Sequence, residues 1–135
     1  MKTAFRILNI LTLALLLAAC GDNEPKVHSS IAGTWRCEET SSLNGTRTYL
    51  VDIDRTISDT TQYIITNFYN TGDTEFIKVK LKSNKLTITQ QPTSNITVDP
   101  KLFSGSVIDL TQIILSYTVR DGLSDVKVEA TYSRN

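Results

Sequence analysis

The sequence has very little histidine and cysteine, which restricts the chemistry that it can perform. His28 is its single histidine, and Cys20 and Cys37 are its two cysteines. Zinc sites are usually built from several such ligands, and nucleophilic catalysis usually needs a base within hydrogen-bond reach of the nucleophile. The sequence also lacks a Gly-rich phosphate loop, a Gly-x-Ser-x-Gly elbow and a His-Glu-x-x-His motif. We therefore expect no catalysis, no cofactor and no metal site.

No apolar run is long enough for a membrane-spanning helix, but a shorter one stands at the N-terminus. Lys2 and Arg6 precede a largely apolar, uncharged stretch over residues 7–19 that ends in small residues. A spanning helix needs about 20 apolar residues, whereas a basic start and a short apolar core are typical of a secretory signal peptide. The sequence predicts a signal peptide over residues 1–19, with cleavage between Ala19 and Cys20.

The end of this stretch, Leu17-Ala18-Ala19-Cys20, resembles the lipobox of bacterial lipoproteins. The resemblance implies that the Cys20 thiol receives a diacylglyceryl group and that acyl chains anchor the mature protein. Gly21 follows the cysteine, and in the enterobacterial sorting system the absence of Asp there favours the outer membrane. Asp22 and Glu24 loosely resemble the acidic export signal of the Bacteroides group. We expect an outer-membrane lipoprotein that faces either the periplasm or the cell surface.

The rest of the chain divides into a connection and one domain. Residues 20–30 are polar, with Pro25 and no apolar periodicity, which predicts a lipidated cysteine followed by a flexible tether. Residues 31–135 are enough for a single domain. With Cys20 lipidated, Cys37 has no partner for a disulfide within the chain. The mature chain would carry 12 basic and 14 acidic side chains, so nucleic acid is not an expected partner.

Apolar and polar residues alternate with period two through most of this domain, and no segment has helical periodicity. The pattern predicts half-buried strands at about 34–39, 48–54, 62–69, 76–82, 86–88, 105–107, 113–119 and 126–133. Turn-forming residues separate these runs, and residues 91–101 form the one long connection. We expect an all-β fold, an antiparallel up-and-down meander of about eight strands. Such a sheet closes into a small barrel, which we favour, or folds into a β-sandwich.

The start of the first strand, Gly33-Thr34-Trp35, resembles the Gly-x-Trp motif of lipocalins and their calycin relatives. Gly33 and Trp35 match that motif, which implies that the Trp35 indole closes one end of a barrel. In the family a late Arg or Lys packs over this Trp, and Arg134 and Arg120 are both candidates. Together with residues 65–70, 117–122 and 130–132, the motif also resembles small lipocalin-like lipoproteins of the Bacteroides group, which implies no particular activity.

Three polar features of the domain have two interpretations each. Asp52 and Asp54 share one face of a predicted strand, about 7 Å apart. They form either a glycosidase-like or calcium-binding pair of carboxylates or an ordinary solvated strand surface. Residues 78, 80 and 82 form a lysine row, either a patch for an anionic polymer or the water side of a strand. Asp59-Thr60-Thr61 fits a short O-glycosylation motif at Thr60, which also occurs by chance.

The inward-facing residues are bulky, which favours a packed barrel interior over a ligand cavity. Phe68, Tyr69 and Phe76 flank a turn and form either an exposed aromatic interaction tip or a plug at one end. We therefore expect a lipid-anchored, non-catalytic binding or interaction domain, with an envelope protein, a glycan or a small apolar ligand as partner. The alternatives are a structural accessory of an outer-membrane assembly and a lipocalin-type carrier of a small apolar ligand.

Overall fold

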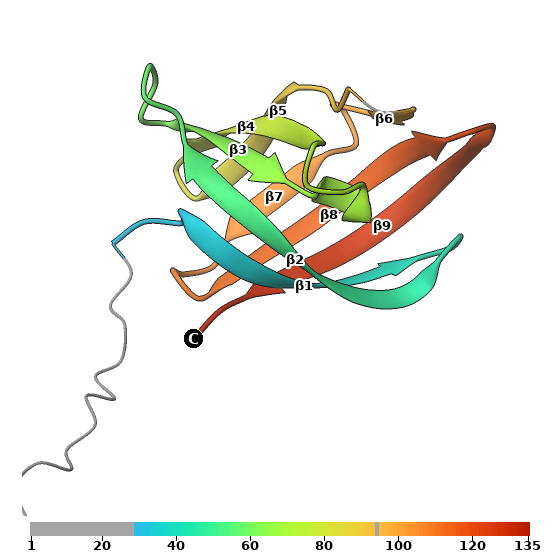
Figure 1. The fold of residues 1–135 in the computed structure, drawn as a ribbon, viewed down its shortest axis with the longest axis horizontal. Helices are drawn as coiled ribbons and strands as arrows, with labels where there is room; N and C mark the ends of the chain where they lie inside the picture. Colours follow the sequence, from blue (N-terminus) through green and yellow to red (C-terminus); the bar gives the residue numbers. More distant parts are fainter. Residues whose placement is uncertain (1–28, 94) are drawn as a thin grey trace, which may run out of the picture.

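The computed structural model describes residues 29–93 and 95–135, which form nine strands and one short 3-10 turn, η2 (Figure 1). The predicted signal peptide, the Ala19–Cys20 cleavage site and the Cys20 lipidation site lie outside the described residues. The elements are β1 (Gly33–Ser41), β2 (Gly45–Arg55), β3 (Gln62–Thr66), η2 (Phe68–Asn70), β4 (Phe76–Lys82), β5 (Lys85–Gln90), β6 (Ile96–Val98), β7 (Ser104–Val107), β8 (Gln112–Asp121) and β9 (Ser124–Ser133).

Eight of the strands form a closed antiparallel barrel, and β6 is an additional strand. Neighbours along the chain pair from β1 to β5, β5 pairs with β7, and β7 leads through β8 to β9. The ring closes because β9 also pairs with β1, from Arg36 opposite Ser133 to Ser41 opposite Val128. The predicted all-β meander and barrel are confirmed, and the alternative of a β-sandwich is wrong. Closure leaves the main barrel without a free sheet edge.

The predicted connection over residues 91–101 contains β6, which the sequence analysis missed. β7 pairs with residues 113–116 of β8, and β6 pairs with residues 119–121 of the same edge. The two short strands therefore share one side of β8, and the loop over residues 99–103 interrupts them. A strand of three residues is too short to show a period-two pattern, so the sequence predicts a loop there.

One continuous core fills the inner side of the strands. Inward residues alternate with exposed ones along β1, β8 and β9, and most are fully buried. The wall is tight where β5 meets β7, because a Cβ on Gly105 would lie 2.7 Å from Leu86 Cβ and 2.8 Å from Leu115 Cδ2. Burial of each large aliphatic side chain contributes about 1.5–3 kcal/mol, so this core is the main stabilising element.

Trp35 lies at the end of the barrel where the chain enters it, which we call the entry end. Its indole is fully buried, and Nε1 donates a hydrogen bond to the Ile31 carbonyl oxygen at 2.8 Å. The Arg134 guanidinium stacks 4.1 Å from the ring centre. Arg134 also donates to the carbonyl oxygens of Ala32 and Leu110, both at 2.6 Å, and to that of Ser30. Of the two candidates, Arg134 is the cation over the tryptophan.

Candidate interaction site

The opposite end of the barrel, the far end, holds a buried carboxylate. Glu39 faces inward on β1 and has no solvent exposure. It accepts hydrogen bonds from Arg47 Nε at 2.8 Å, Tyr49 Oη at 2.5 Å and Tyr117 Oη at 2.9 Å. Arg47 Nη2 lies 2.8 Å from the same carboxylate. Because the charge is paired and both oxygens are hydrogen-bonded, the barrel tolerates a buried ion here.

The groups around Glu39 are held in their protonated forms. Burial raises the pKa of the Tyr49, Tyr117 and Tyr132 hydroxyls, and it raises the pKa of the Cys37 thiol to about 12. A thiol with such a pKa forms almost no thiolate at neutral pH and is a poor nucleophile. The alternation of β1 places Glu39 on the inner face with Trp35 and Cys37, but the sequence analysis did not recognise its polar cluster, since Tyr117 is 78 residues away.

The 3-10 turn η2 closes the far end above this cluster. Phe68 and Tyr69 are buried, so the interpretation as an exposed aromatic tip was wrong for both, and Phe76 is half-buried at the start of β4. The Phe68 ring lies 4.8 Å from that of Tyr117, and Arg47 stacks 4.5 Å from the Tyr69 ring. These apolar rings pack onto the core because the chain turns inward, with positive φ at Asn67 and Tyr69. Phe68 and Tyr69 therefore plug the far end of the barrel, which agrees with the second of the two interpretations of these aromatic residues.

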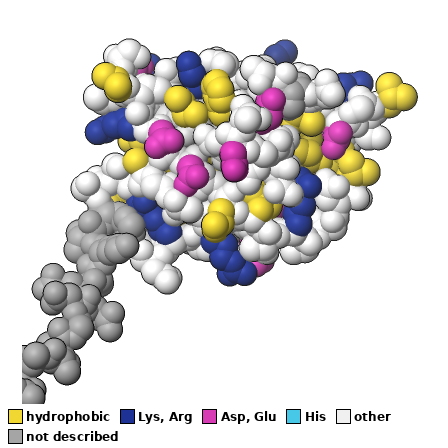
Figure 2. Space-filling view, viewed as in Figure 1, with side chains coloured by type: hydrophobic (Ala, Val, Ile, Leu, Met, Phe, Trp, Pro, Cys, Tyr) yellow, Lys and Arg dark blue, Asp and Glu magenta, His cyan; other side chains and the backbone are white. Residues whose placement is uncertain are grey.

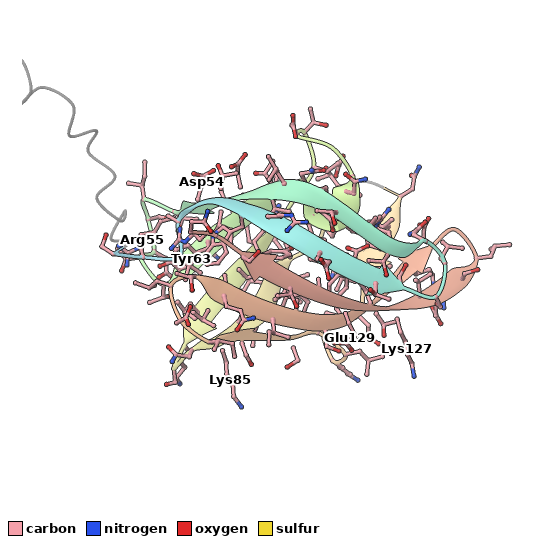
Figure 3. All side chains as sticks on the ribbon, turned by 90° about the horizontal axis from the view of Figure 1, so that it is seen from below. Asp54, Arg55, Tyr63, Lys85, Lys127 and Glu129 are labelled. Atoms are coloured by element: carbon pink, nitrogen blue, oxygen red, sulfur yellow. The ribbon has the colours of Figure 1, made fainter. Side chains whose placement is uncertain are left out.

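The polar features singled out in the sequence lie on the outer surface, where Lys80 of the lysine row forms an ion pair with Asp59 of the Asp-Thr-Thr motif at 3.8 Å. Asp52 and Asp54 are exposed on β2, and Asp52 accepts a hydrogen bond from Thr34 Oγ1 at 2.5 Å. Asp54, like Lys85, Lys127 and Glu129, points away from the barrel (Figure 3). The lysine row lies on the outer face of β4, and Thr60 is exposed in the hairpin between β2 and β3. Over residues 29–93 and 95–135, no group of three or more His, Cys, Asp and Glu residues is placed to hold a metal ion.

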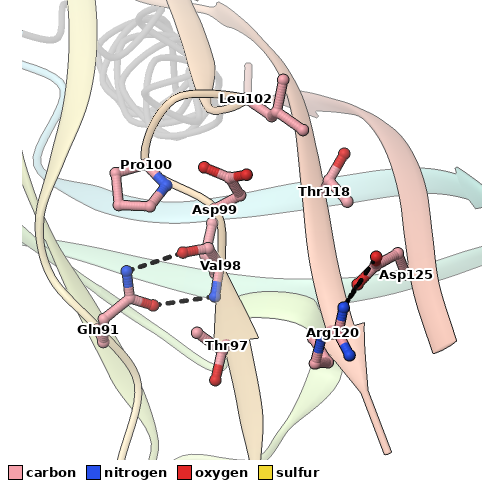
Figure 4. Close-up of a pocket in the computed structure, with 9 residues that line it drawn as sticks. All are labelled: Gln91, Thr97, Val98, Asp99, Pro100, Leu102, Thr118, Arg120 and Asp125. Atoms are coloured by element: carbon pink, nitrogen blue, oxygen red, sulfur yellow. Dashed lines mark hydrogen bonds and ion pairs between the residues drawn. The ribbon is translucent and has the colours of Figure 1, made fainter. Parts of the chain in front are cut away.

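A pocket of about 410 Å³ lies on the outside of the barrel at the far end, between β6, the following loop and β8 (Figure 4). We call it the β6 groove. It is lined by Gln91, Thr97, Val98, Asp99, Pro100, Leu102, Thr118, Arg120 and Asp125. None of these residues was a candidate in the sequence analysis apart from Arg120. The groove depends on strand β6, and the sequence offered only the two prolines of the long connection as a signal.

One wall of the groove is held by a side chain that acts as a strand partner. The Gln91 amide donates to the Val98 carbonyl oxygen at 2.8 Å and accepts from the Val98 amide nitrogen at 2.9 Å. These two bonds replace those that a neighbouring strand would make to the free edge of β6. Asp99 Oδ1 accepts from the Lys101 amide at 2.9 Å, which fixes the start of the loop.

The open side of the groove combines charge with aliphatic surface. Arg120 Nη2 donates to Asp125 Oδ2 at 2.9 Å, and both side chains are more than half exposed. The Asp99 carboxylate is exposed, and Leu102 is 55% exposed beside Pro100. The groove thus offers hydrogen-bond donors, acceptors and an apolar patch, and its nine lining residues include no aromatic ring.

Comparison with solved structures identifies a similar fold. A protein described as a redesigned beta barrel superposes with a TM-score of 0.55, covering 78% of this chain and 91% of that chain at 18% sequence identity. At this identity the likeness shows the β-barrel fold alone. No known protein family and no curated protein matches the sequence. Within the described residues, no helix has the length and apolarity needed to span a bilayer.

Proposed function

We propose that this chain is a lipid-anchored protein of the cell envelope whose barrel is a non-catalytic domain that binds a protein partner at the β6 groove. The contrast between the two sides of the barrel wall carries the proposal. The inner side is one continuous core, plugged at its far end by Phe68 and Tyr69. The outer side has an open groove of about 410 Å³.

The chemistry of the groove favours a protein over the other expected partners. A small apolar ligand binds best in an enclosed cavity that buries most of its surface, whereas this groove is open to solvent and mixes Val98, Pro100 and Leu102 with threonines, carboxylates and an arginine. A sugar ring binds best against an aromatic face, and the groove lining has none. A polypeptide can use the Arg120–Asp125 pair, the Asp99 carboxylate and the exposed Leu102 side chain together.

The position of the groove is compatible with an anchor at Cys20. The anchor itself is proposed from the lipobox-like sequence and from the basic and apolar residues before it. Ser30 is held at the entry end by Arg134, and the groove lies at the far end beside the end of β8. A membrane-attached chain would therefore present the groove away from the point of attachment.

Site-specific photocrosslinking in the native envelope tests the partner site. A photoreactive amino acid is placed at Leu102 in the groove and, as a matched control, at Leu50 on the outer face of β2, since the two side chains are 55% and 60% exposed. We expect a discrete protein adduct from position 102 that is absent from position 50 and is lost on Asp99→Lys substitution. Identical adducts at both positions, or none at 102, would contradict the proposal.

A ligand titration tests the carrier alternative. Fatty acids, sterols and haem are titrated against Trp35 emission, and we expect no saturable quenching because the inward residues occupy the barrel. Saturable quenching that is lost when Tyr117 is changed but kept when Phe68 is changed would favour a lipocalin-type carrier instead. Tyr117 is the informative position because its ring lies at the centre of the far-end core, against Phe68 and Phe103.

A further inference from the structure

The rim of the entry end carries exposed apolar side chains on two separate hairpins. Ile57, between β2 and β3, is fully exposed, and Ile108 and Leu110, between β7 and β8, are 51% and 37% exposed. A hollow of about 520 Å³ beside Ile57 is lined on one side by Ile64. Figure 2 shows hydrophobic side chains at the upper left corner of the molecule, over the hairpin between β2 and β3. These hairpins lie across the barrel mouth from each other, so they can contact one plane together.

The same rim is rich in basic side chains. Lys82 and Lys85 are exposed on either side of the hairpin between β4 and β5, which stands between the two apolar hairpins. The two acidic residues of the rim hairpins already have partners: Asp59 accepts from Thr61 and forms an ion pair with Lys80 at 3.8 Å, and Asp109 accepts from Thr111. Basic residues on or near this rim are Arg55, Lys80, Lys82, Lys85 and Arg134, and acidic ones are Asp54, Asp59 and Asp109.

The far end has exposed apolar tips as well, but its charge has the opposite sign. Leu123 is almost fully exposed at the hairpin between β8 and β9, close to Asp121 and Asp125. The acidic residues on or near this end are Glu39, Asp73, Glu75, Asp99, Asp121 and Asp125, and the basic ones are Arg47, Lys101, Arg120 and Lys127. An anionic lipid surface would attract the entry end and repel the far end.

We infer that the entry end rests on the lipid leaflet that holds the anchor, with Ile57, Ile108 and Leu110 at the headgroup boundary and Lys82 and Lys85 against anionic headgroups. The inference rests on the proposed lipidation of Cys20. Ser30 follows Cys20 by ten positions, a stretch that spans at most about 35 Å when extended. The chain enters the barrel at this rim, because Arg134 holds the Ser30 carbonyl there. Apolar tips ringed by lysines are the composition that binds membrane interfaces.

Environment-sensitive fluorescence on the full mature protein tests this orientation. The lipidated chain carries Ile57→Cys or, as a control of equal exposure at the other end, Leu123→Cys, and each thiol is labelled with a polarity-sensitive dye. Cys37 is buried and does not compete for the label. In vesicles of phosphatidylcholine and phosphatidylglycerol we expect a blue shift at position 57 relative to unlipidated Cys20→Ala protein in buffer, and no shift at position 123. The substitutions Lys82→Glu and Lys85→Glu should reduce the shift, whereas Lys127→Glu on β9 should leave it unchanged.

Vesicle flotation, measured on the same samples, separates the inference from the anchor. Flotation without a shift at position 57 would overturn the seating while leaving the anchor in place. Equal shifts at positions 57 and 123 would overturn the orientation. Failure of the lipidated chain to float would overturn the anchor and, with it, the inference that depends on it.

Discussion

At the scale of single residues, Trp35 connects the first strand of the barrel, β1, with the residue that follows the last strand, Arg134. The indole is buried against the core, bonded to the Ile31 carbonyl and covered by Arg134. The substitution Trp35→Ala should lower the free energy of unfolding by about 3–5 kcal/mol, as deletion of a large buried aromatic ring does. Chemical denaturation measures this, with Leu50→Ala on the exposed face of β2 as the control. A mutant with the stability of the wild type, or solvent-quenched Trp35 emission in the folded protein, would contradict the assignment.

Glu39 is a stabilising residue only as long as its partners stay in place. Because Arg47, Tyr49 and Tyr117 all donate to its carboxylate, Glu39→Ala leaves a guanidinium and two phenols without their acceptor. We expect a loss of about 3–5 kcal/mol in unfolding free energy, the usual cost of removing one partner of a buried ion pair. Glu129→Ala, which removes an exposed carboxylate from β9, should stay within about 0.5 kcal/mol. Equal effects of the two substitutions in urea denaturation would contradict this role.

The Cys37 thiol should be inert while the barrel is folded. Burial raises its pKa from 9.0 to about 12, so the thiol ionises at a lower pH in the unfolded chain than in the folded one. The free energy of unfolding should therefore fall as the pH rises from about 9 towards 12. A thiol reagent added to Cys20→Ala protein at pH 8, where Cys37 is the only thiol, should react fast only after denaturant is added. Rapid labelling of the native protein would show that Cys37 is accessible.

At the scale of elements, the junction of β5 and β7 is the shortest pairing in the barrel ring. It contains two residue pairs, Lys85 with Ser106 and Leu86 with Gly105. A Cβ at position 105 would overlap Leu86 and Leu115, so Gly105→Ala should cost about 1–3 kcal/mol through overpacking. Thermal melting measures this, and Ser106→Ala next to it on β7 is the control. An unchanged melting temperature for Gly105→Ala would mean that β5 and β7 can shift apart enough to accommodate the added methyl group.

The long strands could be predicted from the sequence because each buries one face. Alternation located β1, β2, β4, β8 and β9 and assigned their inner faces, since the core lies on one side and water on the other. The turn η2 could not be predicted, because its left-handed backbone at Asn67 and Tyr69 is held by tertiary contacts such as the one between Arg47 and Tyr69. The β6 groove was missed for a similar reason. It depends on Gln91 and on residues of β6 and β8 that only the folded barrel brings together.

At the scale of the whole molecule, the proposed attachment to the membrane depends on one residue. The substitution Cys20→Ala should abolish lipidation, so the protein would remain uncleaved or be released from the membrane fraction. Mass spectrometry of the wild type should show the mass of the acyl groups on a chain that begins at Cys20. Cys37→Ala serves as the control, since that thiol is buried in the barrel. Unchanged membrane association of Cys20→Ala, without added acyl mass in the wild type, would contradict the anchor.

The closing strand β9 follows all the other strands of the barrel in the sequence. It pairs with β8 beside it in the sequence and with β1 at the beginning of the domain, and Arg134 contacts Ala32 across 102 residues. The ring can therefore form only after the other strands of the barrel have been made, and contacts this distant in sequence also form slowly. The barrel thus depends on its final strand, because a sheet that lacks β9 exposes the edges of both β1 and β8.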